Sequence, residues 1–255
     1  MPQTSGNRPY RWLAQYYDRM FEGSRSPGEA ARQRVLGPIL PRLESACDLA
    51  CGTGTTALAL AGMGIKMFAV DLSPVMCRLA REKARRARLP LRVLRSDMRN
   101  FRLPEPVDLI TCEFDALNHV PRKADLRLVV RSVARALRPG GYFYFDDNNR
   151  LGFEQYWGAT IWVEKPGVAF VMHGGHDGPH DRAWTDVEWF IQEGSVWHRH
   201  REHVEEVCWS SSEIRSALGQ AGFNQVRSWD ATPFFKNEPL IRPGCRTVYL
   251  ARRPV

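Results

Sequence analysis

Apolar positions recur along this chain of 255 residues with two different spacings. Short apolar runs, typical of buried strands, alternate with stretches in which apolar residues return every three or four positions, as in amphipathic helices. Because strands and helices take turns in this way, we expect an α/β fold built on a doubly wound parallel sheet. The runs lie at 46–50, 66–71, 91–95, 107–113 and 142–146, and the helical stretches at 9–21, 28–43, 55–63, 74–88 and 124–137.

Residues 151–209 interrupt this alternation. Two runs, 183–191 and 196–208, flank a short polar segment that contains Gly194, which predicts an antiparallel hairpin. The same segment holds six of the eight tryptophans and six of the seven histidines. We therefore expect an inserted antiparallel β cap whose aromatic side chains line a substrate pocket.

The alternating pattern resumes after the insertion. Ser210 and Glu213 have the spacing of a capping box, which predicts a helix that starts there and ends before Gly222. Two further apolar runs, 225–230 and 246–251, complete the predicted sheet. The chain thus divides into an N-terminal helical segment at 1–43, a core at 44–150 and 210–255, and an inserted cap at 151–209.

The formal net charge of +8 is concentrated in one short part of the chain. Ten basic and two acidic residues lie between Arg78 and Arg102, whereas the rest is balanced. In the predicted helix 74–88, arginines at helical spacing face away from the apolar side. A solvated surface is the favoured interpretation, and an RNA-binding footprint is the alternative. The arginines are Arg78, Arg81, Arg85 and Arg88.

Other sequence features limit the compartment and the partners. The first eleven residues lack the apolar stretch of a signal peptide, and the chain has no run of 18 apolar residues, so we expect neither secretion nor a membrane span. The six cysteines have neither zinc nor redox spacing, which predicts free thiols in the cytoplasm. Glycine and proline between His173, His176 and His180 predict an exposed loop there, and we expect no metal.

The segment Asp48–Leu49–Ala50–Cys51–Gly52–Thr53–Gly54 carries the most informative pattern. It joins the first predicted strand to a helix, and its glycines allow a sharp turn and a close approach of the backbone to a ligand. Asp71 follows nineteen residues after Gly52 at the end of the second strand, where a carboxylate can accept both hydroxyls of a ribose. The spacing alone also fits a dinucleotide fingerprint.

Acidic residues near three strand ends separate these two interpretations. Asp48, Asp71 and Asp97 suit a ligand with an ammonium group, a ribose and an adenine amine, and they do not suit a pyrophosphate. Together with the turn Arg138–Pro139–Gly140–Gly141, this order of motifs resembles the class I S-adenosylmethionine (SAM)-dependent methyltransferases, which have a Rossmann-like sheet. The resemblance covers about residues 45–147.

The resemblance implies a role for each matching position. The segment around Tyr17 would close over SAM, and the first loop would hold the methionine part of the cofactor. Asp71 would bind the ribose, and the residues that follow the second and third strands would surround the adenine. The residues after the fourth strand would lie beside the reactive methyl group. The implied cofactor-binding residues are Tyr17, Asp48, Ala50, Gly52, Gly54, Asp71, Leu72, Met76, Asp97, Met98, Glu113 and Phe114.

Methyl transfer from a sulfonium needs mainly alignment of the reactants, and a base only where the nucleophile starts protonated. His119 and Tyr17 are the candidate catalytic residues, although packing is the favoured role for His119 and explains Tyr17 equally well. In the cap, alternation along 196–208 places His200 and Glu202 on one face, where they could bind a polar or amino substrate or face solvent. Trp157 and Trp189 are candidate pocket walls.

We therefore predict a SAM-dependent methyltransferase that acts on N or O of a small molecule, with a slight preference for N. The alternatives are an RNA methyltransferase that uses the helix 74–88 and a SAM-binding module without catalysis. Nucleic acid is the less favoured partner, and a homodimer is possible. The cofactor would leave as S-adenosylhomocysteine.

Overall fold

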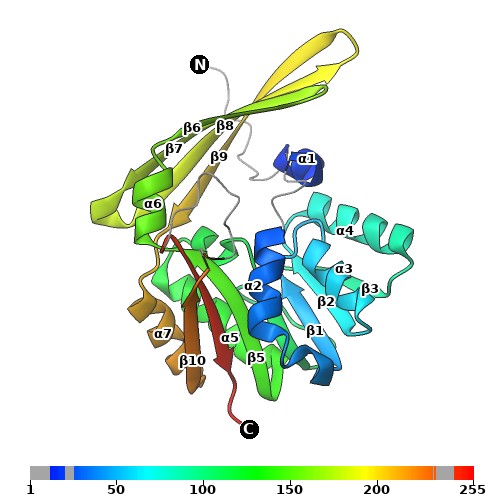
Figure 1. The fold of residues 1–255 in the computed structure, drawn as a ribbon, viewed down its shortest axis with the longest axis vertical. Coiled ribbons are helices and arrows are strands. Elements are labelled where there is room, and N and C mark those ends of the chain that lie inside the picture. Colours follow the sequence, from blue (N-terminus) through cyan, green and yellow to red (C-terminus); the bar gives the residue numbers. More distant parts are fainter. Residues whose placement is uncertain (1–11, 21–25, 232, 234–243) are drawn as a thin grey trace.

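The computed structural model describes residues 12–20, 26–231, 233 and 244–255. A seven-stranded sheet in the order β10-β11-β5-β4-β1-β2-β3 forms its centre (Figure 1). Six strands run in one direction, and β11 alone runs against them, antiparallel to both of its neighbours. The strands are β1 (Ser45–Leu49), β2 (Lys66–Asp71), β3 (Leu91–Arg95), β4 (Val107–Cys112), β5 (Leu137–Asn148), β10 (Gln225–Asp230) and β11 (Arg246–Arg252).

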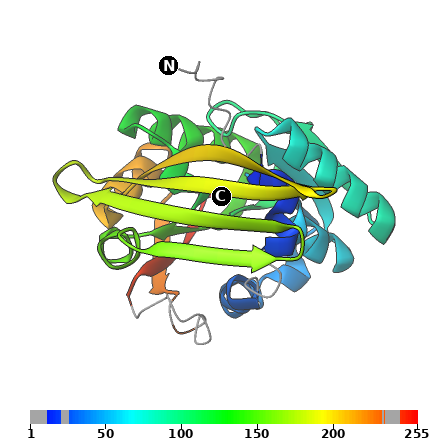
Figure 2. The same cartoon turned by 90° about the horizontal axis from the view of Figure 1, so that it is seen from above.

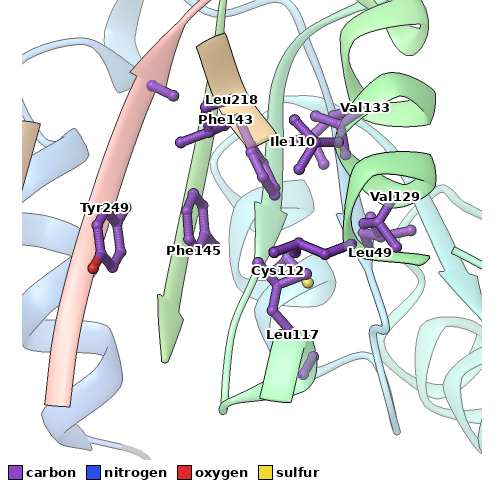
Figure 3. Packing of buried hydrophobic residues seen from close by; sticks show 14 of the residues in the cluster. Leu49, Ile110, Cys112, Leu117, Val129, Val133, Phe143, Phe145, Leu218 and Tyr249 are labelled. Atoms are coloured by element: carbon purple, nitrogen blue, oxygen red, sulfur yellow. The ribbon is translucent and has the colours of Figure 1, made fainter. Parts of the chain in front are cut away.

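Helices cover both faces of this sheet because its strands are apolar on both sides. One face packs against α2 (Ser26–Leu36), α3 (Thr55–Gly62) and α4 (Pro74–Ala87). The other face packs against α5 (Lys123–Ala136) and α7 (Ser211–Gln220). Figure 3 shows this second core, where Phe145 stacks on Tyr249 and Ile110 meets Val133 of α5. The prediction of a doubly wound α/β sheet is confirmed.

A second sheet lies over the carboxyl ends of the parallel strands of the first sheet (Figures 1 and 2). It is an antiparallel meander in the order β6-β7-β8-β9, and α6 (Arg150–Tyr156) leads into it from β5. The N-terminal helix α1 (Leu13–Met20) lies below this sheet, and Tyr16 packs against its apolar cluster. The strands are β6 (Thr160–Lys165), β7 (Val168–Asp177), β8 (Arg182–Glu193) and β9 (Val196–Val207).

The predicted hairpin corresponds to β8 and β9, but the sequence interpretation missed β6, β7 and α6. The expected loop around the three histidines was wrong, because His173 and His176 belong to β7 and only His180 lies in the short 3-10 helix at Gly178–His180. Gly174 and Gly175 are needed in this strand for close packing. A Cβ on Gly174 would lie 2.6 Å from the carbonyl oxygen of Trp157, and one on Gly175 would lie 2.2 Å from the Trp184 ring.

Smaller differences concern the ends of elements. The helix expected at 28–43 ends at Leu36 and is followed by a 3-10 turn at Leu40–Arg42, where Pro41 lies. Strand β5 begins at Leu137 and includes the predicted Arg138–Gly141 turn as an irregularity in its pairing with β4. Of the helix expected at 9–21, the structure describes only residues 12–20, so the rest of that prediction lies outside the described residues. Among the described residues, no helix is long and apolar enough to cross a membrane.

Candidate active site

The loop between β1 and α3 bends sharply through left-handed backbone conformations. Ala50, Gly52 and Gly54 have φ values of 56°, 54° and 80°. At Gly54 a Cβ would also lie 3.0 Å from the Cβ of Ala80 in α4, so glycine lets the loop lie against that helix. Among the described residues, nothing lies within 4 Å of a Cβ built on Gly52, so this side of the loop leaves room for a ligand.

Asp71 ties this loop to the end of β2. One carboxylate oxygen accepts the N–H of Gly52 at 2.8 Å, and the other accepts the N–H of Ser73 at 2.8 Å. Burial raises the pKa of Asp71, and these backbone donors oppose that shift. Leu72 next to it is 62% exposed, whereas Met76 is buried in the first turn of α4. An open apolar side chain beside a carboxylate suits an adenosine.

Asp48 supports the loop from inside the protein. Its side chain is buried and accepts hydrogen bonds from the hydroxyl of Thr111, at 2.9 Å, and from the backbone N–H of Ala57 in α3. Burial raises the pKa of Asp48 to about 6. Its position therefore indicates that Asp48 orients the loop and the start of α3, while the backbone of the loop faces outward.

Asp97 follows β3 and forms an ion pair with Arg99. Arg99 donates to both of its carboxylate oxygens, the shortest bond being 2.6 Å, and this lowers the pKa of Asp97. Both side chains are partly exposed, as is Met98. If Asp97 accepts a hydrogen bond from an adenine amine, its carboxylate would bond to Arg99 and to the adenine at the same time.

Glu113 and Phe114 follow β4 and have different surroundings. Glu113 is buried and pairs with Arg32 of α2, with N–O distances of 2.7 and 2.9 Å. Burial raises the pKa of Glu113 to about 7, although Arg32 opposes the shift. Phe114 and Asp115 both have left-handed backbones, with φ of 59° and 50°. This turn exposes part of the Phe114 ring.

The helix α1 is tied to the cofactor loop by a small polar network. Asp18 accepts a hydrogen bond from Thr53 Oγ1 at 2.6 Å and one from Lys83 Nζ at 2.9 Å. Lys83 also donates to Thr53 and Thr55. Tyr17 is half-buried in the same helix. The sequence interpretation noted Asp18 only as part of a segment that closes over SAM, and it missed Arg32 and Lys83, whose partners are distant in the chain.

Replacing Asp18 with alanine should weaken SAM binding by about fivefold, or about 1 kcal/mol, because the Asp18–Lys83 pair is partly exposed and solvent screens it. Calorimetric titration with SAM would measure the change. Asp186→Ala is the matched control, since Asp186 pairs with His203 on the exposed surface of the cap. Equal affinities for the two variants would contradict a coupling between α1 and the loop.

The cap side chains proposed for substrate face the N-terminal segment. Glu202 is buried and accepts hydrogen bonds from Trp189 Nε1, at 3.0 Å, and from the backbone N–H of Trp12, at 2.7 Å. His200 stacks on the Trp12 ring with 3.6 Å between ring centroids. Trp189 is fully buried. Glu202 and His200 thus hold Trp12, and with it the start of α1, against the cap.

Trp157 lies apart from this group. It follows α6, and its ring meets Phe153 edge-on at 4.4 Å between centroids. Three other tryptophans of the insertion are substantially exposed, so the cap does not enclose a continuous aromatic pocket among the described residues. They are Trp162, Trp184 and Trp197.

His119 lies in the 3-10 turn Ala116–His119 after β4, close to β9. Its Nδ1 is 3.3 Å from the carbonyl oxygen of Glu205, and burial lowers the pKa of His119. Asn118 fixes this turn, because its amide donates to the carbonyls of Asn148 and Val207 and accepts the N–H of Asn148. The imidazole is therefore held where the cap meets the sheet.

Arg246 of β11 is buried beside the same turn. It donates to Asp146 Oδ2 at 2.5 Å and to Asp115 Oδ1, and thus joins β11 to β5 and to the loop after β4. Asp147 and Glu206 are buried nearby. The resulting polar cluster lies at the carboxyl ends of β4 and β5, under the cap.

The arginines of α4 are exposed, as expected for a solvated surface. Arg78 pairs with Glu82 one turn later at 2.9 Å, and Arg81 donates to the carbonyl of Val93 at 3.0 Å. Two of the four candidate RNA-binding side chains are therefore engaged within the protein.

Comparison with known proteins places this site in a family. Residues 46–141 match the model of a methyltransferase domain. A Bacillus subtilis protein named as the methyltransferase YqeM is 26% identical over 220 residues, 86% of this chain and 87% of its own. The dTDP-4-amino-2,3,4,6-tetradeoxy-D-glucose N,N-dimethyltransferase of Saccharopolyspora spinosa is 35% identical over 102 residues, which are 40% of this chain and 39% of that protein.

A solved structure extends the similarity over the whole chain. The SAM-dependent methyltransferase from Clostridium acetobutylicum superposes with a TM-score of 0.79 at 24% identity, and the match covers 96% of this chain and 99% of that one. Residues 46–141 thus match a methyltransferase domain, and the fold is that of a solved SAM-dependent methyltransferase. The resemblance to class I SAM-dependent methyltransferases that the sequence predicts is confirmed by this match and this fold.

Proposed function

We propose that the protein transfers the methyl group of SAM to a nitrogen, or alternatively an oxygen, of a small molecule. The observation that carries this proposal is the open backbone loop at Gly52, held by Asp71 next to the exposed Leu72 at the carboxyl edge of the sheet. An adenosine could lie along Leu72 with its ribose hydroxyls at Asp71, and the amino-acid part would follow the loop toward α3.

The acceptor would enter between the cap and the ends of β4 and β5. The sulfonium is an activated leaving group, so the protein needs mainly to align the acceptor with the methyl carbon and to exclude water. The two sheets and α1 surround this position (Figure 1). The cofactor domain is similar both to a sugar N,N-dimethyltransferase and to ubiquinone biosynthesis O-methyltransferases, which supports a small-molecule acceptor with either atom.

His119 would accept the proton of the acceptor. Burial lowers its pKa, so the imidazole is neutral at physiological pH and can take up a proton. We expect His119→Ala to lower kcat by about a hundredfold while the affinity for SAM stays unchanged, since general-base catalysis typically contributes 10²–10⁴. An unchanged kcat would mean that His119 serves only in packing.

A methyl-transfer screen with labelled SAM and pooled amines, phenols and RNA tests the proposed function. Label in a small molecule is the expected result. Transfer to RNA that is lost when Arg78, Arg81, Arg85 and Arg88 are replaced would instead favour the RNA alternative. Tight SAM binding with no transfer to any pool would favour a binding module.

A cytoplasmic location is also part of this proposal. All six cysteines are unpaired thiols, which supports a reducing compartment. A homodimer stays a prediction, to be tested by sedimentation.

A further inference from the structure

Three side chains of the polar cluster converge on one point. Asp115, His119 and Glu206 each offer one nitrogen or oxygen atom, and these atoms all lie within 4.8 Å of one another. Asp115 and His119 come from the loop after β4, whereas Glu206 comes from the end of β9 in the cap. The group therefore spans the junction between the cofactor domain and the cap.

Glu206 is buried, and its hydrogen bond with Asn148 satisfies only part of its carboxyl group. Its side chain is 6% exposed, and within the described part of the chain its Oε2 has no hydrogen-bond partner. Asp147, 1% exposed, has no partner for either oxygen among the same residues. A buried carboxyl oxygen that accepts no hydrogen bond destabilises the protein by about 1–3 kcal/mol. Binding of a ligand that donates a hydrogen bond to this oxygen would therefore be favoured.

The charges of the cluster also favour a cation. Four carboxyl groups, on Asp115, Asp146, Asp147 and Glu206, interact with the guanidinium of Arg246. Arg246 bonds directly to Asp115 and Asp146, which leaves the other two without a bonded cation among the described residues. Burial and the charge of Asp115 raise the pKa of Glu206.

The cluster lies where an acceptor atom has to be. Strand β4 lies between β1, which leads into the cofactor loop, and β5. Asp115 is two residues beyond Glu113, in the loop that the class I resemblance places beside the reactive methyl group. Asp115 and His119 are partly exposed, whereas Glu206 is buried, so a ligand would reach the group from the side of Asp115 and His119.

We propose that Asp115, His119 and Glu206 form the binding site for the amino group of the acceptor, which binds as an ammonium cation and gives one N–H proton to His119 before its nitrogen attacks the methyl carbon. This inference rests on the proposed function and adds to it the substrate class, a small molecule with an alkyl amine. An ammonium offers three N–H donors to three acceptor atoms. A divalent metal ion is disfavoured because Arg246 bonds to Asp115 and would repel a doubly charged ion more strongly.

Sinefungin provides a test that needs no knowledge of the acceptor. This SAM analogue carries a primary amine on carbon in place of the methyl sulfonium, and S-adenosylhomocysteine lacks that amine. We expect the wild-type protein to bind sinefungin at least about tenfold more tightly than S-adenosylhomocysteine, because a hydrogen bond between charged groups contributes about 1.5–3 kcal/mol. Calorimetry at neutral pH, with EDTA present, measures both dissociation constants.

Glu206→Gln should remove most of this preference and leave the affinity for S-adenosylhomocysteine unchanged. Asp115→Asn serves as a second variant if the first does not fold. Glu205→Gln is the matched control, because it removes a negative charge one residue away, where the side chain faces His203 on the outer surface. The control should keep the wild-type preference.

The proposal is wrong if the wild-type protein does not prefer sinefungin, or if the preference survives both Glu206→Gln and Asp115→Asn. It is also wrong if Mn²⁺ binds to the wild type, displaces sinefungin, and no longer binds to either variant. If neither nucleoside binds, the proposed function itself fails. Binding of S-adenosylhomocysteine without the preference contradicts only the ammonium site.

Discussion

Replacing Arg246 with alanine should lower the free energy of unfolding by about 3–5 kcal/mol, because removing one partner of a buried ion pair leaves the other charges uncompensated. Arg246 is enclosed between Asp115 and Asp146, and Asp147 lies next to them. Urea denaturation followed by circular dichroism measures the loss. Arg78→Ala is the matched control, since its exposed pair with Glu82 should contribute less than about 1 kcal/mol.

The loss should depend on pH in a defined direction. Burial raises the pKa of Asp146 and Asp147 in the folded protein, and removing Arg246 raises both further. A carboxyl group whose folded-state pKa is raised stabilises the fold below its unfolded pKa of about 3.9, and this contribution is lost as the pH rises through the folded value. The deficit of the variant should therefore be smaller at pH 5 than at pH 8. A deficit independent of pH would mean that packing of the side chain, and not its charge, stabilises this region.

The sheet was predictable because its strands are short apolar runs with clear ends. The runs 66–71 and 91–95 correspond residue for residue to β2 and β3, and the helix expected at 74–88 begins at Pro74, where Ser73 is its N-cap. These features are local, since a strand buried on both faces and a capped helix are encoded within a few neighbouring residues. The same applies to the glycine loop, whose left-handed turns require glycine at Gly52 and Gly54.

The missed features depend on partners far away in the chain. Strand β7 contains glycines that usually break strands, and contacts with distant residues explain them: the Trp157 backbone lies against Gly174, and the Trp184 ring lies against Gly175. Arg32 meets Glu113 from 81 residues away, and neither helical spacing nor composition pairs them. The cluster around Arg246 combines β4, β5, β9 and β11. Sequence spacing could place Asp115 and Glu206 at strand ends, but it could not bring those ends together.

Asp71→Asn should weaken the binding of SAM by at least about tenfold, or about 1.4 kcal/mol. The change in SAM affinity would combine two roles of the carboxylate. It accepts hydrogen bonds from the N–H groups of Gly52 and Ser73, and it would accept hydrogen bonds from the ribose hydroxyls. Asp186→Asn on the cap surface removes the same charge far from the loop and should leave the affinity unchanged.

A second ligand separates the two roles. In the wild-type protein, 2′-deoxy-S-adenosylhomocysteine should bind about tenfold more weakly than S-adenosylhomocysteine, because it lacks one of the hydroxyls that would donate a hydrogen bond to the Asp71 carboxylate. In Asp71→Asn the two ligands should bind about equally well if the ribose contact is real, since the change in ligand and the change in protein remove the same interaction. If the variant still discriminates between them as the wild type does, Asp71 acts only by holding the loop, and the ribose must be bound by another group.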